Sequence, residues 1–373
     1  MKKHLFVIDL FCGGGGFAAG ASQVEGAEVI LAVDAWERAL AVHAKNHPKA
    51  KHVLMNLGGD VEAFATSLEA FLKKRLPEGA TWHLHGSPPC QSFSLANTIP
   101  TENDPRSNLT LWFLSLIQRM RPPSYSMEQV PASLPFLRKT SAWLFQSGGP
   151  KIYPKVFGKE FGAPTLRKRL YLGEGWCLDD KTYEVRAGKT RKRENSCCVV
   201  DILPEFLEEF APLGAGDIAI RTSQDTTTIR NKAGKNGFRN IEFDRGEGLR
   251  SLDMPYYAII CKGCKLKFFE RVDRDIPYSG RPKSHKWKRL ERFLSLREKA
   301  IIQGYPRSYQ IQSGEHKVRF AKSIDAEAED CSIRVTNTDI CRIIGNSVIP
   351  KVSEAIVGSS VKEARKNSTV TLN

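Results

Sequence analysis

Short apolar runs separated by polar turns recur through the first 130 residues of the chain. Residues 5–10 form a run that is apolar up to Asp9, which is typical of a strand buried on both faces of a sheet. Similar runs predict four more strands, at residues 29–33, 52–55, 81–84 and 124–127. Segments between them predict helices, at residues 60–75 and 109–119. This alternation predicts an α/β fold with a mostly parallel sheet and helices on both faces.

A glycine-rich turn follows the first of these strands. The sequence from Phe11 to Gly16 reads FCGGGG, and residues 18–22 can open a helix. Such a unit suits a nucleotide, because glycine lets a ligand approach the backbone and a helix start offers free N–H donors. Asp34 ends the second strand roughly 20 residues later, where an acidic side chain can hold two ribose hydroxyls. No Gly-Lys-Ser/Thr follows the turn, so an adenosine ligand such as S-adenosylmethionine fits better than a phosphate-cradling loop.

The fourth strand leads into a loop that carries a cysteine. Residues 86–94 read GSPPCQSFS, and the two prolines should make this loop rigid and hold Cys90 outward. A lone Pro-Pro-Cys is more often a structural cysteine beside a turn, so the rest of the chain has to decide. The fifth strand ends in Glu128, a position where a carboxylate is costly unless it has a partner or a task. An ordinary acidic residue in a loop is an equally good interpretation of Glu128 alone.

The charge of the chain indicates an anionic partner. Its formal net charge is +15, which favours nucleic acid first and an anionic membrane surface second. No apolar run approaches the roughly 20 residues that span a bilayer, and Asp9 interrupts a start that briefly resembles a signal peptide. The nine scattered cysteines favour a reducing compartment and free thiols. Cys261 and Cys264 form a CxxC without a second one nearby, so structural roles are favoured over zinc and no metal is expected.

Motifs later in the chain complete a pattern. Residues 161–171 read FGAPTLRKRLY, with Arg167 and Arg169 on one face of an extended segment. Residues 292–306 contain a capping box and predict a short helix, and residues 345–350 read GNSVIP before a last helix. Together with the glycine turn, the Pro-Cys loop and Glu128, and in this order, these motifs resemble the DNA cytosine-5 methyltransferase family. The resemblance implies a Rossmann-like, S-adenosylmethionine-dependent methyltransferase fold with a smaller inserted target-recognition domain.

The resemblance also implies which residues bind the cofactor, with S-adenosylhomocysteine as the product. Phe11 would lie against the adenine, and Asn346 and Ser347 would hydrogen-bond the methionine end. Asn56 is favoured over Asp60 for contact with the adenine amino group, although turn and cap chemistry would also explain both residues. The implied cofactor-binding residues are Phe11, Gly13, Gly15, Gly16, Asp34, Asn56, Pro88, Asn346, Ser347 and Val348.

The implied catalytic residues follow from what cytosine requires. Carbon 5 becomes nucleophilic only when a thiolate, here from Cys90, adds to carbon 6 of the ring. Glu128 would act as the acid at ring nitrogen 3, and Arg169, with Arg167 beside it, would stabilise charge at the exocyclic oxygen. The target base must be flipped out of the duplex for this chemistry to occur.

Departures from the family pattern keep other interpretations open. Gln129 stands where the family has asparagine, Thr165 where it has glutamine, and Ala258 where it often has threonine. A catalytically weak DNA-binding relative is therefore one alternative. A transfer-RNA methyltransferase is another, but its usual Cys-Phe-Thr signature is absent after the glutamate. A Rossmann oxidoreductase is disfavoured because the glycines do not continue as GxGxxG.

The organisation that we predict has three parts: residues 1–172 and 290–373 form the catalytic domain, and residues 173–289 form the target-recognition domain. The middle part is rich in basic and polar residues, which suits a surface that binds phosphates. We expect an intracellular monomer that acts as a stand-alone enzyme, with double-stranded DNA in its cleft. A cognate restriction enzyme as a partner is left open, because the sequence does not indicate whether one exists. The sequence does not indicate which bases flank the target cytosine.

Overall fold

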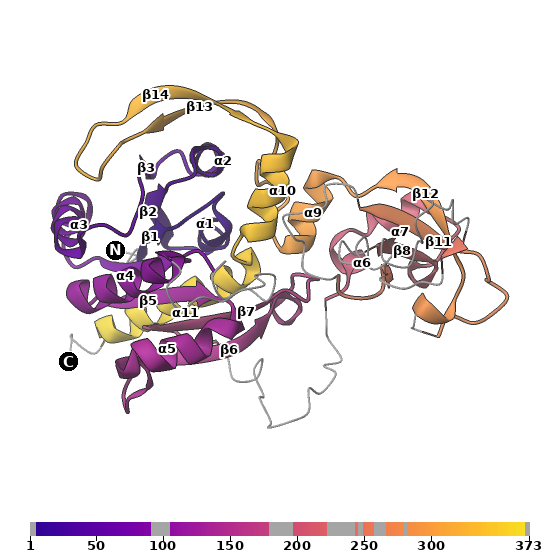
Figure 1. The fold of residues 1–373 in the computed structure, drawn as a ribbon, viewed down its shortest axis with the longest axis horizontal. Helices are drawn as coiled ribbons and strands as arrows, with labels where there is room; N and C mark the ends of the chain where they lie inside the picture. Colours follow the sequence, from indigo (N-terminus) through magenta and orange to yellow (C-terminus); the bar gives the residue numbers. More distant parts are fainter. Residues whose placement is uncertain are drawn as a thin grey trace.

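The computed structural model has a large sheet and a small sheet, which lie in the left and right parts of Figure 1. It describes residues 5–90, 105–178, 197–221, 243–244, 249–256, 266–279 and 282–369. The large sheet has seven strands in the order β3-β2-β1-β4-β5-β7-β6. Neighbours from β3 to β5 are parallel, and β7 and β6 are antiparallel additions. The strands are β1 (Leu5–Leu10), β2 (Ala27–Asp34), β3 (Lys51–Leu54), β4 (Thr81–Gly86), β5 (Ser124–Gln129), β6 (Lys151–Phe157) and β7 (Lys168–Glu174).

Helices cover both faces of the large sheet because its central strand is apolar on both sides. Ile8 and Leu10 pack with the helices α3 (Val61–Arg75), α4 (Pro105–Met120) and α5 (Leu134–Thr140). Val7 points the other way and packs with α1 (Gly16–Ala21) and α11 (Pro350–Thr369). The α/β fold and the mostly parallel sheet that the sequence predicted are confirmed. Asp60 caps α3 as expected, with its Oδ1 accepting from the N–H of Glu62 at 2.8 Å.

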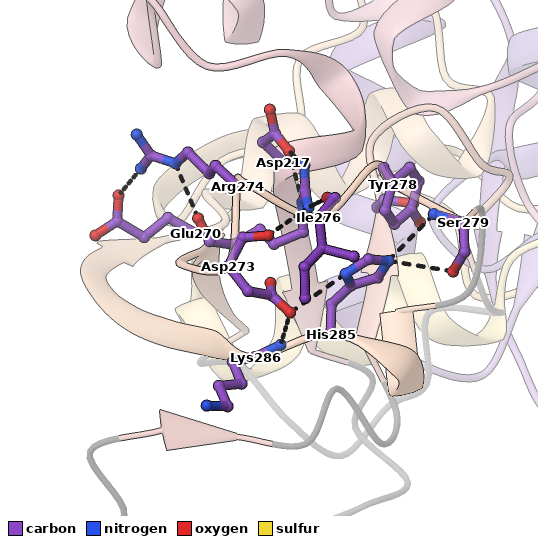
Figure 2. Close-up of polar contacts among 11 residues, drawn as sticks. Asp217, Glu270, Asp273, Arg274, Ile276, Tyr278, Ser279, His285 and Lys286 are labelled. Atoms are coloured by element: carbon purple, nitrogen blue, oxygen red, sulfur yellow. Dashed lines mark hydrogen bonds and ion pairs between the residues drawn. The ribbon is translucent and has the colours of Figure 1, made fainter.

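The small sheet has five antiparallel strands in the order β10-β8-β11-β12-β9. These are β8 (Ile218–Arg221), β9 (Phe243–Asp244), β10 (Leu249–Ser251), β11 (Lys267–Arg271) and β12 (Trp287–Phe293). The short helices α6 (Val199–Ile202) and α7 (Glu205–Glu209) precede it. Buried Arg271 pairs with Asp217 at 2.6 Å and donates to the carbonyl of Asp273 at 2.9 Å. Figure 2 draws these contacts around the labelled Asp217 and Asp273. They join the loop after β11 to the residue that precedes β8.

Several elements of the catalytic part were not predicted from the sequence. Helix α9 (Leu296–Gln303) was expected, with Ser295 and Glu298 forming its capping box, but α2 (Glu37–Asn46) and α10 (Asn337–Asn346) were not. A hairpin of β13 (Gly314–Phe320) and β14 (Glu329–Val335) arches over α2 (Figure 1). Just after β13, Ala321 exchanges two backbone hydrogen bonds with β3, each of 2.9 Å. This contact covers part of the exposed edge of the large sheet.

Short 3-10 helices complete the described elements: η1 (Pro131–Ser133), η2 (Ala142–Phe145), η3 (Gly158–Phe161), η5 (Ala215–Asp217) and η6 (Pro282–Ser284). None of the helices that the structure describes is both long enough and apolar enough to cross a membrane. Among the same described residues, no three His, Cys, Asp or Glu side chains are grouped so that they could hold a metal ion. Cys261 and Cys264 lie outside the described residues.

Candidate active site

Four neighbouring strands bring the predicted site residues to one edge of the large sheet. Strands β1, β4 and β5 are parallel neighbours, so their carboxyl ends lie side by side. Phe11 follows β1, Cys90 follows β4, and Glu128 lies within the end of β5. Strand β7 runs antiparallel to β5, so its beginning lies at this same edge and supplies Arg169. The site is therefore assembled from four neighbouring strands.

Glu128 and Arg169 form an ion pair inside this site. The Nε atom of Arg169 lies 2.7 Å from Oε1 of Glu128, and their side chains are only 15% and 6% exposed. In this arrangement the guanidinium compensates the carboxylate, so a buried charge at Glu128 becomes tolerable. Sequence reasoning had left Glu128 without a partner, and the structure supplies one.

The charges of this pair act on the Cys90 thiol. Burial raises the pKa of Cys90 above its usual value, and the nearby carboxylate of Glu128 raises it further. The guanidinium groups of Arg169 and Arg167 act in the opposite direction and lower this pKa. The balance leaves the thiol protonated in the free protein at neutral pH, so any nucleophilic role of Cys90 requires activation.

Arg167 has a different environment from Arg169. Its side chain is buried, and Nη1 donates to the carbonyl of Gly345 at 2.8 Å. Its backbone N–H donates to Oγ1 of Thr165 at 3.2 Å. Burial lowers the pKa of Arg167, and the positive charge of Arg169 lowers it further. Both arginines lie near Cys90, but Arg167 also ties this part of the site to the end of α10.

The glycine turn after β1 is packed against the C-terminal part of the chain. A methyl group on Gly14 would collide with Ile343, one on Gly15 with the hydroxyl of Tyr309, and one on Gly16 with the carbonyl of Val348. Gly15 also has a φ of 85°, which disfavours any other residue there. These three glycines are thus explained by close packing of protein on protein. A methyl group on Gly13 would meet nothing within 4 Å, so the open side of the turn lies there.

Asp34 closes this turn. Its Oδ2 accepts from the N–H of Gly13 and its Oδ1 from the N–H of Trp36, each at 2.7 Å. Each carboxylate oxygen keeps a second lone pair, so both could still accept from a ligand. The predicted contact of Asp34 with ribose hydroxyls stays a prediction, now beside an observed structural role.

Asn56 lines a surface hollow, and Phe11 contacts Trp112, another residue of its lining. Asn56 follows β3 and, with Asp60 and Trp112, lines a cavity of about 240 Å³. The Phe11 ring meets the Trp112 ring edge-on, with centroids 6.2 Å apart. The carboxylate of Asp60 is engaged in capping α3, which leaves the amide of Asn56 as the less committed polar group.

The GNSV motif lies between two helices rather than only at the start of one. Asn346 ends α10 and is exposed, whereas Ser347 is buried and donates its hydroxyl to the carbonyl of Ile344 at 2.9 Å. Val348 packs with the core beside α1 and α11. The helix after this motif was expected, whereas the helix before it, α10, was not.

Comparison with known proteins identifies the family. A model of the C-5 cytosine-specific DNA methylases matches residues 5–324. The chain belongs to this family. Its members methylate carbon 5 of cytosine in DNA, and the family and the fold together imply a methyl donor of the S-adenosylmethionine type.

Individual C-5 methylases are similar over most of the chain. The type II methyltransferase M1.HphI of Haemophilus parahaemolyticus is 29% identical over 369 residues, covering 96% of this chain and 87% of that protein. M.FnuDI of Fusobacterium nucleatum, also a type II methyltransferase, is 24% identical over 318 residues, covering 82% and 85%. The crystal structure of an E. coli prophage protein, titled as a DNA modification methyltransferase, matches with a TM-score of 0.54 at 21% identity, covering 97% of this chain and 99% of that one. This last likeness supports the predicted Rossmann-like methyltransferase fold.

Several contacts of this C-5 methylase could not be found by sequence reasoning. The hydroxyl of Tyr309 donates to the carbonyl of Gly14 at 2.7 Å, across 295 residues of chain. The hydroxyl of Ser87 donates to the carbonyl of Phe11 at 3.0 Å and joins the Pro-Cys loop to the glycine turn. Trp36 shares the carboxylate of Asp34 with the glycine turn, because its N–H donates to the Oδ1 atom while Gly13 donates to Oδ2.

Two of the three departures from the family pattern have a structural setting. Gln129 and Thr165 are fully buried, and each makes hydrogen bonds within the site. Thr165 also lies next to Tyr256, whose N–H donates to the carbonyl of Pro164 at 2.7 Å. This contact links the arginine segment to the chain that follows β10 of the small sheet. Ala258 lies outside the described residues.

Proposed function

We propose that this C-5 methylase acts by covalent catalysis through Cys90 on a flipped cytosine. The observation that carries the proposal is the convergence of Cys90, Glu128 and Arg169 at one edge of the sheet, with the last two paired at 2.7 Å. The thiolate of Cys90 adds to carbon 6, which makes carbon 5 nucleophilic. After methylation, loss of the proton from carbon 5 and expulsion of the thiolate restore the aromatic ring.

Glu128 and Arg169 stabilise the negative charge that this addition creates in the ring. Glu128 holds the proton at ring nitrogen 3, so that electron density moved into the ring is neutralised. Arg169 stabilises the exocyclic oxygen and, by its charge, favours the thiolate form of Cys90. Arg167 supports the same site from its buried position beside Gly345.

The methyl donor is S-adenosylmethionine, which supplies an electrophilic methyl group when it is bound. The open side of Gly13, the carboxylate of Asp34 and the hollow lined by Asn56 fit an adenosine group. Phe11 would lie against the adenine, and Asn346 and Ser347 would bind the methionine end. The remaining proposed contacts come from Gly15, Gly16, Pro88 and Val348.

The substrate that we propose is double-stranded DNA, held between the catalytic domain and the small sheet. The net charge of +15 and the type II names of the relatives support this choice. The division into residues 1–172, 173–289 and 290–373 is part of the proposal, although β7 continues to Glu174 and β12 to Phe293. We further propose an intracellular monomer that protects DNA from a cognate restriction enzyme.

Methyl transfer from labelled S-adenosylmethionine tests the proposal. Purified protein and its Cys90→Ala variant are each given duplex DNA and, separately, transfer RNA. We expect label in DNA with the unaltered protein and none with the variant. Label only in transfer RNA would overturn the substrate, and label in DNA with the variant would overturn the nucleophile.

A further inference from the structure

Gln129 makes a set of hydrogen bonds that the proposed chemistry does not use. It is the last residue of β5 and is completely buried. Its Nε2 donates to the carbonyl of Pro88 at 2.8 Å and lies 3.3 Å from Oγ1 of Thr110 on α4. Its Oε1 accepts from the N–H of Val130 at 3.3 Å. Both ends of the amide are therefore satisfied, and the side chain has one fixed orientation.

The carbonyl of Pro88 is an informative partner because Pro88 lies two residues before Cys90. Proline has no N–H, so the carbonyl is the only hydrogen-bonding group that its backbone offers. On the other side of Pro88, Ser87 is held by its N–H to the carbonyl of Leu10 at 3.3 Å and by its hydroxyl to the carbonyl of Phe11. The loop is thus fixed at two successive residues before the thiol.

The position of Gln129 next to Glu128 adds a second argument. Neighbouring residues of a strand point to opposite faces, so the end of β5 can direct one side chain to each side. Glu128 pairs with Arg169, and Gln129 reaches the Pro-Cys loop. A single strand end then sets the relative position of the proposed acid and the proposed nucleophile.

We propose that Gln129 is a positioning residue for Cys90. Through the Pro88 carbonyl it holds the thiol at the distance from the Glu128–Arg169 pair that attack on carbon 6 requires. The family pattern has asparagine at this position. The longer side chain of Gln129 reaches the carbonyl of Pro88, and Thr110 holds its amide in place. This inference rests on the proposed nucleophilic role of Cys90.

A covalent trap measures this role directly. Duplex DNA in which 5-fluorocytosine replaces cytosine needs no knowledge of the target sequence, and the fluorine prevents the final elimination, so the Cys90 adduct accumulates. We would measure the rate of denaturant-resistant complex formation at saturating S-adenosylmethionine for the unaltered protein and for Gln129→Leu. Since small misplacements of reacting groups are costly, we expect a loss on the order of tenfold to a hundredfold. Because Pro88 is also a proposed contact of the cofactor, each variant is assayed at its own saturating concentration of S-adenosylmethionine, so that weaker cofactor binding does not lower the measured rate.

Gln303→Leu is the matched control. Gln303 is equally buried, and its amide has no hydrogen-bond partner in the described part of the chain. We expect this variant to form the adduct at the unaltered rate. If Gln129 had a purely structural role, Gln129→Leu would have a lower melting temperature, but its folded fraction would form the adduct at the unaltered rate. That result would overturn the proposal.

A second variant covers the case in which Gln129→Leu does not fold. Gln129→Asn keeps the amide but shortens the side chain by one methylene, so we expect slower trapping with a cooperative unfolding transition. Trapping by Gln129→Asn at the unaltered rate would also overturn the proposal. Absence of any adduct with the unaltered protein would instead refute the nucleophilic role of Cys90, which separates the two failures.

Discussion

We expect Asp9→Asn to change how the stability of this methylase depends on pH. Asp9 lies in the central strand β1 and is fully buried, and neither carboxylate oxygen has a hydrogen-bond partner among the described residues. Burial raises the pKa of Asp9 to about 8, and the nearby N–H of Ala18 offsets this only in part. His43, whose Nε2 is 3.8 Å from Asp9, has its pKa lowered to about 3 by burial. Both groups are therefore neutral in the folded protein at pH 7.

The magnitude follows from the difference between the folded and unfolded states. The pKa of Asp9 rises from 3.8 to about 8, and each pKa unit corresponds to about 1.4 kcal/mol. Between these values the unfolded chain releases the proton while the folded protein retains it. Stability is thus fully present below pH 3.8 and is lost as pH rises toward 8, by about 1.4 kcal/mol per unit and about 6 kcal/mol in total. Asparagine resembles the protonated carboxyl and does not titrate, so the variant lacks this loss.

Urea unfolding of both proteins at several pH values between 5 and 8 measures the effect. We expect the free energy of unfolding of the unaltered protein to fall relative to that of Asp9→Asn by about 1.4 kcal/mol for each pH unit. His43 and the other groups titrate in both proteins, so they cancel in the difference. Coincident transitions by fluorescence and circular dichroism establish two-state behaviour. A difference that does not change with pH would mean that Asp9 is ionised in the folded state, and it would refute this reasoning.

Two further predictions concern the site. Replacing Arg169 with glutamine removes the charge that lowers the pKa of Cys90, so we expect the 5-fluorocytosine adduct to form at least tenfold more slowly at pH 7.5 and the deficit to shrink at higher pH. An equal deficit at every pH would contradict this explanation. Arg169→Lys is the control that keeps the charge. Gly15→Ala should destabilise the protein by roughly 1–3 kcal/mol in urea unfolding, because the new methyl group collides with the Tyr309 hydroxyl at a positive φ. Recovery of that loss in Gly15→Ala combined with Tyr309→Phe would assign it to the collision, whereas no recovery would assign it to the backbone.

The central strands could be predicted because each of them is buried on both faces. The expected strands at residues 5–10 and 124–127 correspond to β1 (Leu5–Leu10) and β5 (Ser124–Gln129), with differences only at the ends. The hairpin of β13 and β14 was missed because its outward residues are charged and its inward residues pack mainly on α2, not on a second sheet. Neither strand has a continuous apolar run, so neither was recognised from the sequence.

The site likewise contains residues that could be placed from the sequence and contacts that could not. Cys90 and Glu128 could be placed from the sequence because each lies at the end of a predictable strand, and parallel neighbours bring their ends together. The contacts that fix these residues connect distant positions, such as Gln129 with Pro88 and Tyr309 with Gly14. A local sequence pattern does not indicate which distant residues form such pairs. The glycine turn shows the consequence, because glycines that suggested only a ligand are largely required by the C-terminal part of the chain.

The arginine segment explains why that C-terminal part must be in place before the site can form. Arg167 is buried, and its guanidinium needs an acceptor, which the carbonyl of Gly345 provides at the end of α10. In the same segment, the N–H of Leu166 donates to the carbonyl of Tyr256 at 2.7 Å, in the chain that follows β10 of the small sheet. Without α10, Arg167 would be a buried cation lacking its acceptor, at a cost of several kcal/mol. The segment that supplies Arg169 to Glu128 is therefore held by both later parts of the chain, although β5 itself is positioned by its neighbours β4 and β7.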